Sequence, residues 1–208
     1  CTKLVDIHPS IAVLKSLKVL NLRDCKSLRT LPTKIGMESL EALILWGCSS
    51  LVRFSEIDGK MERLKTLDLS GCYRVENLLE NLQQAKLLEE LDGNDFISIP
   101  ASLTRLSKLA NLILSNCNMC TFGEADTHYD ISGLSSLSYL DFSGNNLISI
   151  PASLTRLSKL HVLDLSNCNV CTLGEADIRS DLSSLSSLIC LDLSGKNFIT
   201  ILLDLTEK

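Results

Sequence analysis

Residues 17–25 read LKVLNLRDC, and the outline of this segment recurs eight times along the 208-residue chain. Each copy begins with a leucine, and neighbouring copies start 21 to 28 residues apart. The leading leucines are Leu17, Leu40, Leu64, Leu88, Leu109, Leu137, Leu160 and Leu188. A unit of this size cannot bury its own apolar face, so it must stack on its neighbours. The period predicts a solenoid of about eight repeats, which we expect to form a single domain over residues 1–208.

Within each copy, apolar residues alternate with other residues, which is typical of a half-buried strand. Leu20 and Leu22 are expected to point into the core, and the residues beside them to point away from it. Eight stacked strands predict a parallel sheet roughly 40 Å long. The stretches that return between strands, such as residues 76–82 and 101–106, carry helix-compatible patterns. The predicted fold is an α/β solenoid, curved like a horseshoe, with the sheet on the concave face and short helices or turns on the convex face.

The ninth position of the repeat holds either cysteine or asparagine in seven copies. These residues are Cys25, Cys48, Cys72, Asn94, Cys117, Asn145 and Cys168. A small side chain with a hydrogen-bond donor can satisfy buried backbone carbonyls where the chain turns off the sheet. We therefore interpret this column as a structural ladder.

The fourth repeat departs from the pattern. Asn94 follows Leu91 by three positions, whereas Asn145 follows Leu140 by five. The fourth repeat therefore lacks two residues, including the second core leucine. This deletion predicts a shortened strand at Asp92–Gly93.

The chain begins and ends within a repeat. Residues 1–7 align with residues 25–31, and residues 198–201 match residues 147–150. In the last repeat, Lys196 stands where cysteine or asparagine is expected. Because solenoids need polar caps at both ends, we expect the chain to be a piece of a larger protein.

Two cysteine pairs, Cys117 with Cys120 and Cys168 with Cys171, resemble a four-cysteine zinc site. The pairs are two repeats apart, which corresponds to about 10 Å in a stacked parallel sheet. Zinc requires its four sulfur ligands at about 2.3 Å from the metal. We therefore expect no metal in this chain.

A column of aspartates follows the predicted strands and is expected on the exposed side of the sheet. It consists of Asp68, Asp92, Asp141, Asp164 and Asp192. Catalysis by paired carboxylates would require a pocket with perturbed pKa values, whereas the face of a solenoid is open and wet. We interpret the column as a solvated acidic face with partner contacts, and we expect no enzyme.

The composition narrows the range of partners. The net charge is −5 and only 4% of the residues are aromatic, which disfavours binding to nucleic acid. No apolar run approaches the roughly 20 residues of a membrane span. Residues 1–74 carry a net charge of +4 and residues 75–208 a net charge of −9. This division fits either a chance distribution or two different contact surfaces.

Exposed positions on and beside the strands are the candidates for partner binding. They are Arg23, Trp46, Thr66, Asp68, Tyr139, Asp141, His161, Asp164 and Asp192. Trp46 carries the greatest weight, because exposed aromatic residues and arginines anchor many interfaces. The alternative for Trp46 is burial under a flanking loop.

The pattern LxxLxLxxCxxLxxLP of residues 17–32 resembles the leucine-rich repeats of plant intracellular nucleotide-binding immune receptors, especially those with an N-terminal TIR domain. The runs LILWGCSSL at residues 43–51 and LDLSGC at residues 67–72 carry the same resemblance, which covers essentially the whole chain.

The resemblance implies the sensor segment of a disease-resistance protein. Such a segment recognises a pathogen effector or a guarded host protein, and it restrains a nucleotide switch in the parent protein. It also implies that ADP or ATP binds only in the parent's nucleotide-binding domain, which would be a second partner, and that this chain holds no cofactor. The implied location is the cytoplasm, with the nucleus as a second compartment.

Two alternatives remain open. One is an extracellular plant repeat receptor, in which glycine precedes the Ile-Pro of each repeat. This chain has Ser98 and Ser149 at that position, it contains no Asn-x-Ser/Thr acceptor, and its unpaired cysteines suit a reducing compartment. The other alternative is a truncated or decayed gene product without a sensing role.

Overall fold

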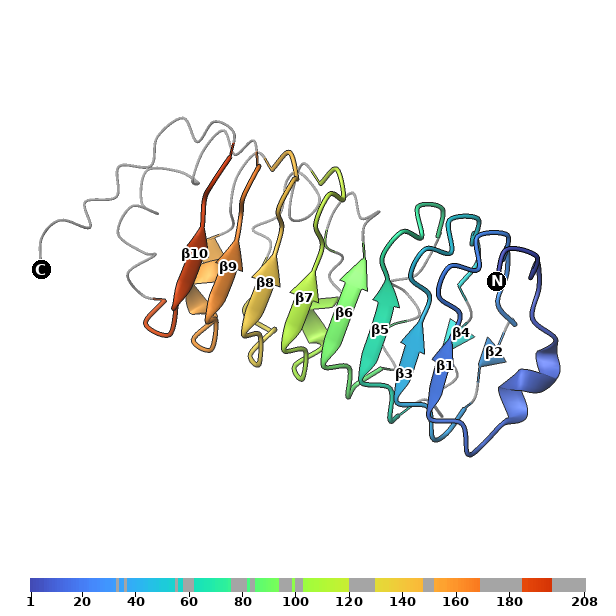
Figure 1. Ribbon diagram of the computed structural model, residues 1–208. Helices are drawn as coiled ribbons and strands as arrows, with labels where there is room; N and C mark the ends of the chain where they lie inside the picture. The colour runs from blue at the N-terminus through green and yellow to red at the C-terminus, as the bar shows by residue number, and fades with distance from the viewer. Residues whose placement is uncertain are drawn as a thin grey trace, which may run out of the picture.

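Eight short parallel strands lie side by side in one sheet within the described residues of the computed structural model (Figure 1). The structure describes residues 1–32, 34–35, 37–54, 56–57, 62–75, 82, 85–93, 99, 103–119, 130–147, 152–168 and 185–195. The strands are β1 (Val19–Asn21), β3 (Ala42–Ile44), β5 (Thr66–Leu69), β6 (Glu90–Gly93), β7 (Asn111–Ile113), β8 (Tyr139–Asp141), β9 (Val162–Asp164) and β10 (Cys190–Asp192). The predicted repeat solenoid is confirmed.

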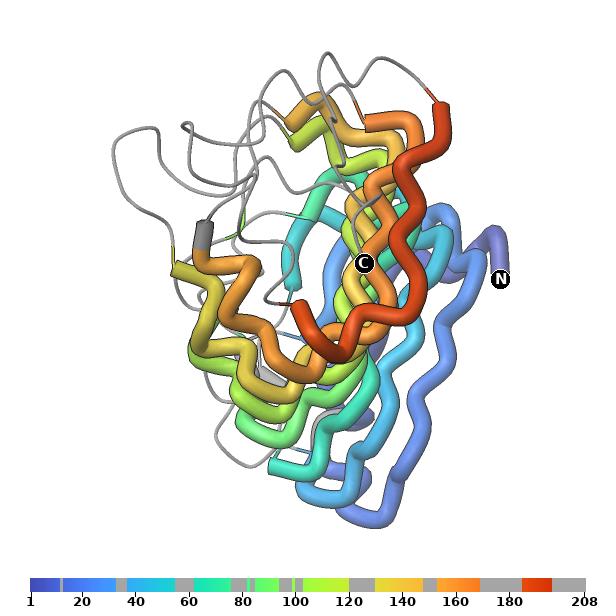
Figure 2. The backbone as a smooth tube through the Cα atoms, turned by 90° about the vertical axis from the view of Figure 1, so that its left-hand side faces the viewer, coloured from blue at the N-terminus to red at the C-terminus, as the bar shows by residue number. Residues whose placement is uncertain are grey.

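The strands follow one another in chain order, and their register repeats without a slip. Leu20 of β1 lies opposite Leu43 of β3, which in turn lies opposite Leu67 of β5. Each central leucine of β1 to β9 is buried, between 0% and 8% exposed, because it points into the space between the sheet and the return stretches. Figure 2, a view along the row of strands, shows the successive turns of the chain nested one behind another.

A second, smaller line of parallel pairing joins the partial repeat at the start of the chain to the repeats that begin at Leu17 and Leu40. It consists of β2 (Lys34–Ile35) and β4 (Glu56–Ile57), and of single bridges that join Asp6 to Thr30 and Thr30 to Arg53. The sequence did not predict this pairing. It forms because equivalent backbone positions of stacked repeats come into register wherever the chain is extended, and not only in the main sheet.

The described return stretches form turns and short 3-10 helices. These helices are η1 (Pro9–Val13), η3 (Leu103–Arg105) and η4 (Ala152–Arg156). The helix-compatible pattern at residues 101–106 yields a single turn, closed by the Leu106 N–H donating to the Leu103 carbonyl at 3.0 Å. Residues 76–81 lie outside the described part of the chain.

The predicted shortening of the fourth strand is wrong. β6 pairs with β5 over four residues, including Asp92 opposite Asp68 and Gly93 opposite Leu69. Parallel pairing uses only the backbone, so Gly93 keeps the strand intact although it lacks the core side chain that Leu69 supplies. The deletion removed a side chain and left the strand in register.

The turn that follows each strand contains a residue with positive φ in all seven repeats where that position is described. These residues are Asp24, Gly47, Gly71, Asn116, Gly144, Asn167 and Gly195. Only glycine, asparagine and aspartate adopt this backbone conformation readily. At Gly144 the turn is also crowded, because an added Cβ would lie 2.3 Å from Asn116 Oδ1 of the preceding repeat.

Candidate functional site

The side of the sheet that faces away from the core, which we call the open face, carries two columns of side chains. The first column contains Val19, Ala42, Thr66, Glu90, Asn111, Tyr139, Val162 and Cys190. The second column contains Asn21, Ile44, Asp68, Asp92, Ile113, Asp141, Asp164 and Asp192. The strand register therefore lines up the acidic residues that the sequence places in equivalent positions.

Most acidic side chains of the second column have a structural role. In each case the side-chain Oδ1 accepts a hydrogen bond from the backbone N–H of the residue two positions later in the chain, at 2.8 to 3.0 Å. Asn21 accepts the equivalent bond. The residues that accept are Asn21, Asp68, Asp141, Asp164 and Asp192. This Asx-type bond closes the turn off the sheet and fixes how each carboxylate is oriented. The recurring Asp-x-Ser triplet is the sequence signal for this bond, which the sequence reasoning missed.

The ninth-position residues hold the turns from the core side. The thiols of Cys48, Cys72 and Cys117 each donate to a carbonyl of the preceding repeat at 3.2 Å, and that of Cys168 does so at 3.0 Å. Asn145 donates to the Leu114 and Phe142 carbonyls at 2.8 and 2.7 Å. Cys25 is buried at the first repeat, and Asn94 lies outside the described residues.

These four thiols are buried. Burial raises the pKa of the Cys168 thiol, which keeps it protonated and able to donate. Within the described residues, no group of three or more His, Cys, Asp or Glu side chains is arranged to hold a metal ion. Cys120 and Cys171 of the suspected zinc pairs lie outside the described part.

The N-terminal end of the open face, on β1 and β3, is apolar and aromatic. The Arg23 guanidinium carbon lies 4.2 Å from the centroid of the Trp46 ring, which is cation–π geometry. Arg23 Nε also lies 4.0 Å from Asp24 Oδ2. Both residues stand on the turns after their strands, and Trp46 is 37% exposed.

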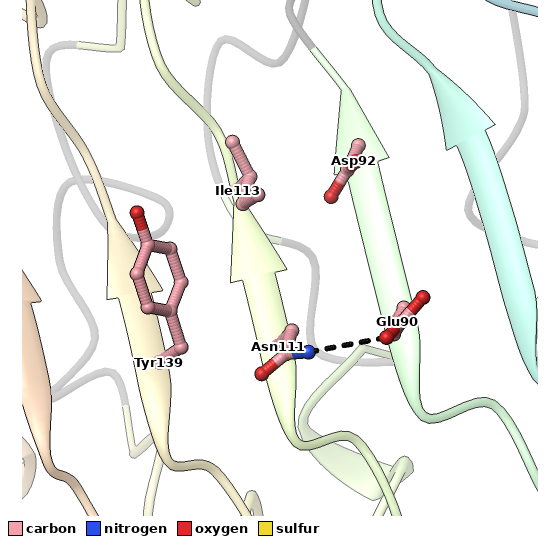
Figure 3. Close-up of a pocket in the computed structure, with 5 residues that line it drawn as sticks. All are labelled: Glu90, Asp92, Asn111, Ile113 and Tyr139. Atoms are coloured by element: carbon pink, nitrogen blue, oxygen red, sulfur yellow. Dashed lines mark hydrogen bonds between the residues drawn. The ribbon is translucent and has the colours of Figure 1, made fainter.

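The middle of the open face contains a shallow hollow of about 330 Å³, which we call the central hollow. It is lined by Glu90 and Asp92 of β6, Asn111 and Ile113 of β7, and Tyr139 of β8. Figure 3 shows the carboxylates along one side, the tyrosine ring along the other, and the two β7 side chains between them. The hollow forms because the β7 side chains leave space between an aromatic ring and two carboxylates.

Hydrogen bonds hold Glu90 in place at this hollow. Its Oε2 accepts from Thr66 Oγ1 at 3.1 Å, and its Oε1 accepts from Asn111 Nδ2 at 3.3 Å. Both donors are neutral, so the negative charge of Glu90 stays on the open face.

Several negative charges lie close to Asp92 in the hollow. Burial, together with the negative charges of Asp68, Glu90 and Asp141, raises the pKa of Asp92 to about 6 from the usual 3.8. Burial and nearby aspartates also raise the pKa of Tyr139. None of the ion pairs in the described part of the chain includes Glu90 or Asp92.

The residues that immediately precede β1, β3, β5 and β6 are alternately basic and acidic. Unlike the carboxylates of the hollow, they form ion pairs. Lys18 Nζ lies 3.3 Å from Glu41 Oε1, and Lys65 Nζ lies 3.2 Å from Glu89 Oε1. Local pairing thus neutralises these four charges, whereas none of the described ion pairs includes an aspartate of the second column.

Comparisons with known proteins agree with this geometry. A family model described as Leucine Rich Repeat matches residues 63–85 and 136–157. TMV resistance protein N of Nicotiana glutinosa is 29% identical over 225 residues, which cover 95% of this chain and 19% of that protein. Disease resistance protein RPP4 of Arabidopsis thaliana is 34% identical over 182 residues, which cover 81% of this chain and 14% of that protein. The chain belongs to the leucine-rich repeat regions of plant disease resistance proteins.

This leucine-rich repeat region spans less than a fifth of the length of either relative. Among solved structures, the ectodomain of the plant membrane receptor kinase GASSHO1/SCHENGEN3 from Arabidopsis thaliana, in complex with CASPARIAN STRIP INTEGRITY FACTOR 2, is similar with a TM-score of 0.67 and 26% identity. The match covers 92% of this chain and 22% of that one. The fold is that of a protein-interaction scaffold. None of the described helices is long and apolar enough to cross a membrane.

The structure distributes the predicted partner-binding residues of the leucine-rich repeat region over three locations. The two columns of the open face contain Thr66, Asp68, Tyr139, Asp141, Asp164 and Asp192. Arg23 and Trp46 meet each other on the turns beyond β1 and β3. His161 is exposed just before β9, where its backbone N–H donates to the Ser138 carbonyl at 2.8 Å.

Sequence reasoning missed Glu90, Asn111 and Ile113 as members of the site. The alternation of each repeat places Glu90 and Asn111 in the same column as Thr66, so a column-by-column reading of the sequence could have found them. The hollow itself depends on side-chain sizes on three neighbouring strands, and no single repeat contains that information.

Proposed function

We propose that this leucine-rich repeat region is the protein-recognition module of a plant intracellular immune receptor. Its open face recognises a pathogen effector or a guarded host protein, and its N-terminal repeats restrain a nucleotide switch in the parent protein. The observation that carries the proposal is the open face itself, which presents aspartates on β5, β8, β9 and β10 that are oriented by turn hydrogen bonds and that none of the described ion pairs includes. A broad, shallow and charged face suits a macromolecule better than a small molecule.

The proposal also covers the catalysis, cofactor, partners and location of the module. The module is not an enzyme and binds no cofactor, and ADP or ATP binds in the nucleotide-binding domain of the parent. Its partners are proteins rather than nucleic acid or membrane, in keeping with the net charge of −5. The module acts in the cytoplasm, with the nucleus as a second compartment.

The test uses the parent receptor, expressed in leaf tissue together with the matching pathogen protein. Changing Asp141, Asp164 and Asp192 to asparagine removes three charges and keeps the Oδ1 acceptor of each turn. We expect this variant to accumulate normally and to lose the ligand-triggered cell-death response. Deletion of the whole repeat region should make the receptor active without ligand. An unchanged response of the triple variant would contradict recognition through the open face, and an inactive deletion would contradict restraint of the switch.

A second candidate function is that of an extracellular receptor ectodomain. The observation in its favour is the similarity to the peptide-bound ectodomain of the GASSHO1/SCHENGEN3 receptor kinase, at 26% identity and a TM-score of 0.67. The two candidates differ in the location of the parent protein. Protease treatment of intact protoplasts would remove an extracellular repeat region and leave an intracellular one whole.

A further inference from the structure

We propose that the central hollow binds an arginine side chain presented by the protein partner, with further basic residues of that partner lying along the second column of the open face. The proposal deepens the proposed function, because it rests on the open face being the recognition surface and names the chemistry of the partner. It is carried by the charge and shape of the hollow and by an arginine site that the chain builds within itself.

The hollow offers what a guanidinium requires. Glu90 and Asp92 stand on one side as acceptors, and the Tyr139 ring stands on the other as a stacking surface (Figure 3). Ile113 lies between them, where it would contact the methylene stem of an incoming side chain. A cation placed there would also relieve the mutual repulsion of the carboxylates.

The chain contains an internal precedent beside the sheet. On the turns after β1 and β3, Arg23 lies 4.2 Å from the Trp46 ring centroid and 4.0 Å from a carboxylate oxygen of Asp24. The turns of this solenoid therefore already place an arginine near both an aromatic ring and a carboxylate. The central hollow has the ring and two carboxylates, and none of the ion pairs among described residues supplies a cation to them.

The flanking carboxylates define the rest of the partner. Asp68 lies one strand from Asp92 on one side, and Asp141, Asp164 and Asp192 lie on consecutive strands on the other. Neighbouring strands are about 4.8 Å apart, so these charges form a row that crosses the strands. A basic segment that runs across the sheet would meet one carboxylate per strand on either side of the hollow.

Arginine fits this site better than lysine does. Its planar guanidinium can stack on a ring while it donates to two carboxylates, and it loses less hydration energy than an ammonium group. Lysine would satisfy the charge without the stacking contact.

The experiment uses the full 208-residue chain and a blocked peptide with three arginines separated by glycine–serine pairs. Nitrogen-15 NMR spectra would follow the titration, and matched peptides would carry lysine or citrulline in place of arginine. The variants are Glu90→Gln with Asp92→Asn, and Tyr139→Leu. The control is Glu38→Gln with Glu62→Gln. It also removes two negative charges, but from exposed positions outside the open face.

We expect the arginine peptide to shift the signals of residues 90–92, 111–113 and 139–141. The Kd should rise about tenfold in the Glu90/Asp92 pair and about threefold in Tyr139→Leu, and it should stay near the wild-type value in the control pair. The lysine peptide should bind about threefold more weakly, and the citrulline peptide should not bind detectably.

Two results would overturn the inference. One is a loss of affinity in the control pair equal to that in the Glu90/Asp92 pair, which would mean attraction by net charge alone. The other is equal binding of the arginine and lysine peptides together with an unaffected Tyr139→Leu variant. Either result leaves the cell-death test of the parent receptor intact, so the recognition function can stand while the arginine site fails. Equally, the arginine site can stand while the recognition function fails, because the peptide titration does not involve the receptor.

Discussion

The open face differs between the N-terminal strands, β1 and β3, and the middle strands, β6 to β8. On β1 and β3 it presents Val19 and Ile44, and the nearby Arg23 is already stacked on Trp46. On β6 to β8 it presents carboxylates and an aromatic ring with no cation from the described ion pairs. The backbone pairing and the buried central leucines are the same in both regions.

One backbone scaffold therefore carries two chemically different surfaces. Core leucines, turn residues, ninth-position donors and the turn-closing acceptors of the second column hold each strand in place, so the first column is the part of the open face that is free to vary. At the N-terminal end Arg23 is stacked on Trp46 and lies beside Asp24, whereas none of the described ion pairs includes Glu90 or Asp92. Unsatisfied charge on a rigid surface is what a partner can use.

The largest effect should come from removing a core leucine in the middle of the sheet. Leu112→Ala on β7 should lower the free energy of unfolding by about 4 kcal/mol, because Leu112 is 0% exposed and has a strand on both sides. Leu20→Ala on the edge strand β1 should cost only about 2 kcal/mol, since Leu20 has a neighbour on one side. Urea unfolding measures both costs, and equal costs would show that the edge strand holds its leucine as tightly as a central strand does.

The crowded turn after β8 should give the next largest effect. Gly144→Ala places a Cβ 2.3 Å from Asn116 Oδ1 at a φ of +71°, so it should cost about 2 kcal/mol. Adding Asn116→Gly should recover part of this loss by removing the clash and leaving only the backbone strain. Thermal unfolding of the single and double variants checks this, and a double variant no more stable than Gly144→Ala would argue against contact between the turns.

Substitutions at Asp141 should separate charge from turn closure. Asp141→Asn keeps the acceptor for the Ser143 N–H, now bonded at 2.8 Å, so stability should be nearly unchanged. Asp141→Ala loses that bond and should cost about 1 kcal/mol. Urea unfolding at neutral pH distinguishes them, and an equal loss in both would mean that the carboxylate charge, rather than the bond, supports the turn.

Asp92 should make the middle strands sensitive to pH. Its pKa is about 6 in the folded chain and near 3.8 when unfolded, so the folded state binds more protons between these values. Its contribution to stability is therefore fully present below pH 4 and lost as the pH rises through 6. We expect a loss of about 1 kcal/mol, after allowing for solvent screening at a half-buried site.

Asp92→Asn should abolish this part of the pH dependence. The variant should gain stability relative to the wild type at pH 7 and show little difference at pH 4, in urea unfolding series. Carbon-13 NMR of the Asp92 carboxyl would report its titration directly. A midpoint near 4 would show that neither burial nor the neighbouring carboxylates raise the pKa of Asp92.

The smallest effect should come from the stacked pair at the N-terminal end. In a double-mutant cycle, Arg23→Ala and Trp46→Leu should show a coupling of about 0.5 kcal/mol, as expected for an exposed cation–π contact. Because Trp46 is the only tryptophan, its fluorescence also reports loss of the guanidinium in Arg23→Ala. Zero coupling with an unchanged spectrum would mean that Arg23 is available to a partner.

Much of the fold could be predicted from the sequence, because the same pattern of apolar residues recurs in every repeat. The period, the alternation around Leu20 and Leu22, and the exposed aspartate column all follow from apolar patterning. The prediction at Gly93 was wrong because it counted missing residues, whereas pairing depends on the backbone register. The small sheet of β2 and β4 was not predicted, since residues in extended return stretches carry no alternation.

By itself, the sequence determined the solenoid, its parallel sheet and the acidic character of its later strands, since these depend on patterns within one repeat. The tertiary structure alone decided where the charges are paired, where the open face is hollowed and which residues line the hollow. The physical reason is that these properties arise between repeats. Lys18 meets Glu41, Arg23 meets Trp46, and Asp92 shares the hollow with Tyr139 only because stacking brings residues more than 20 positions apart into adjacent or nearby repeats.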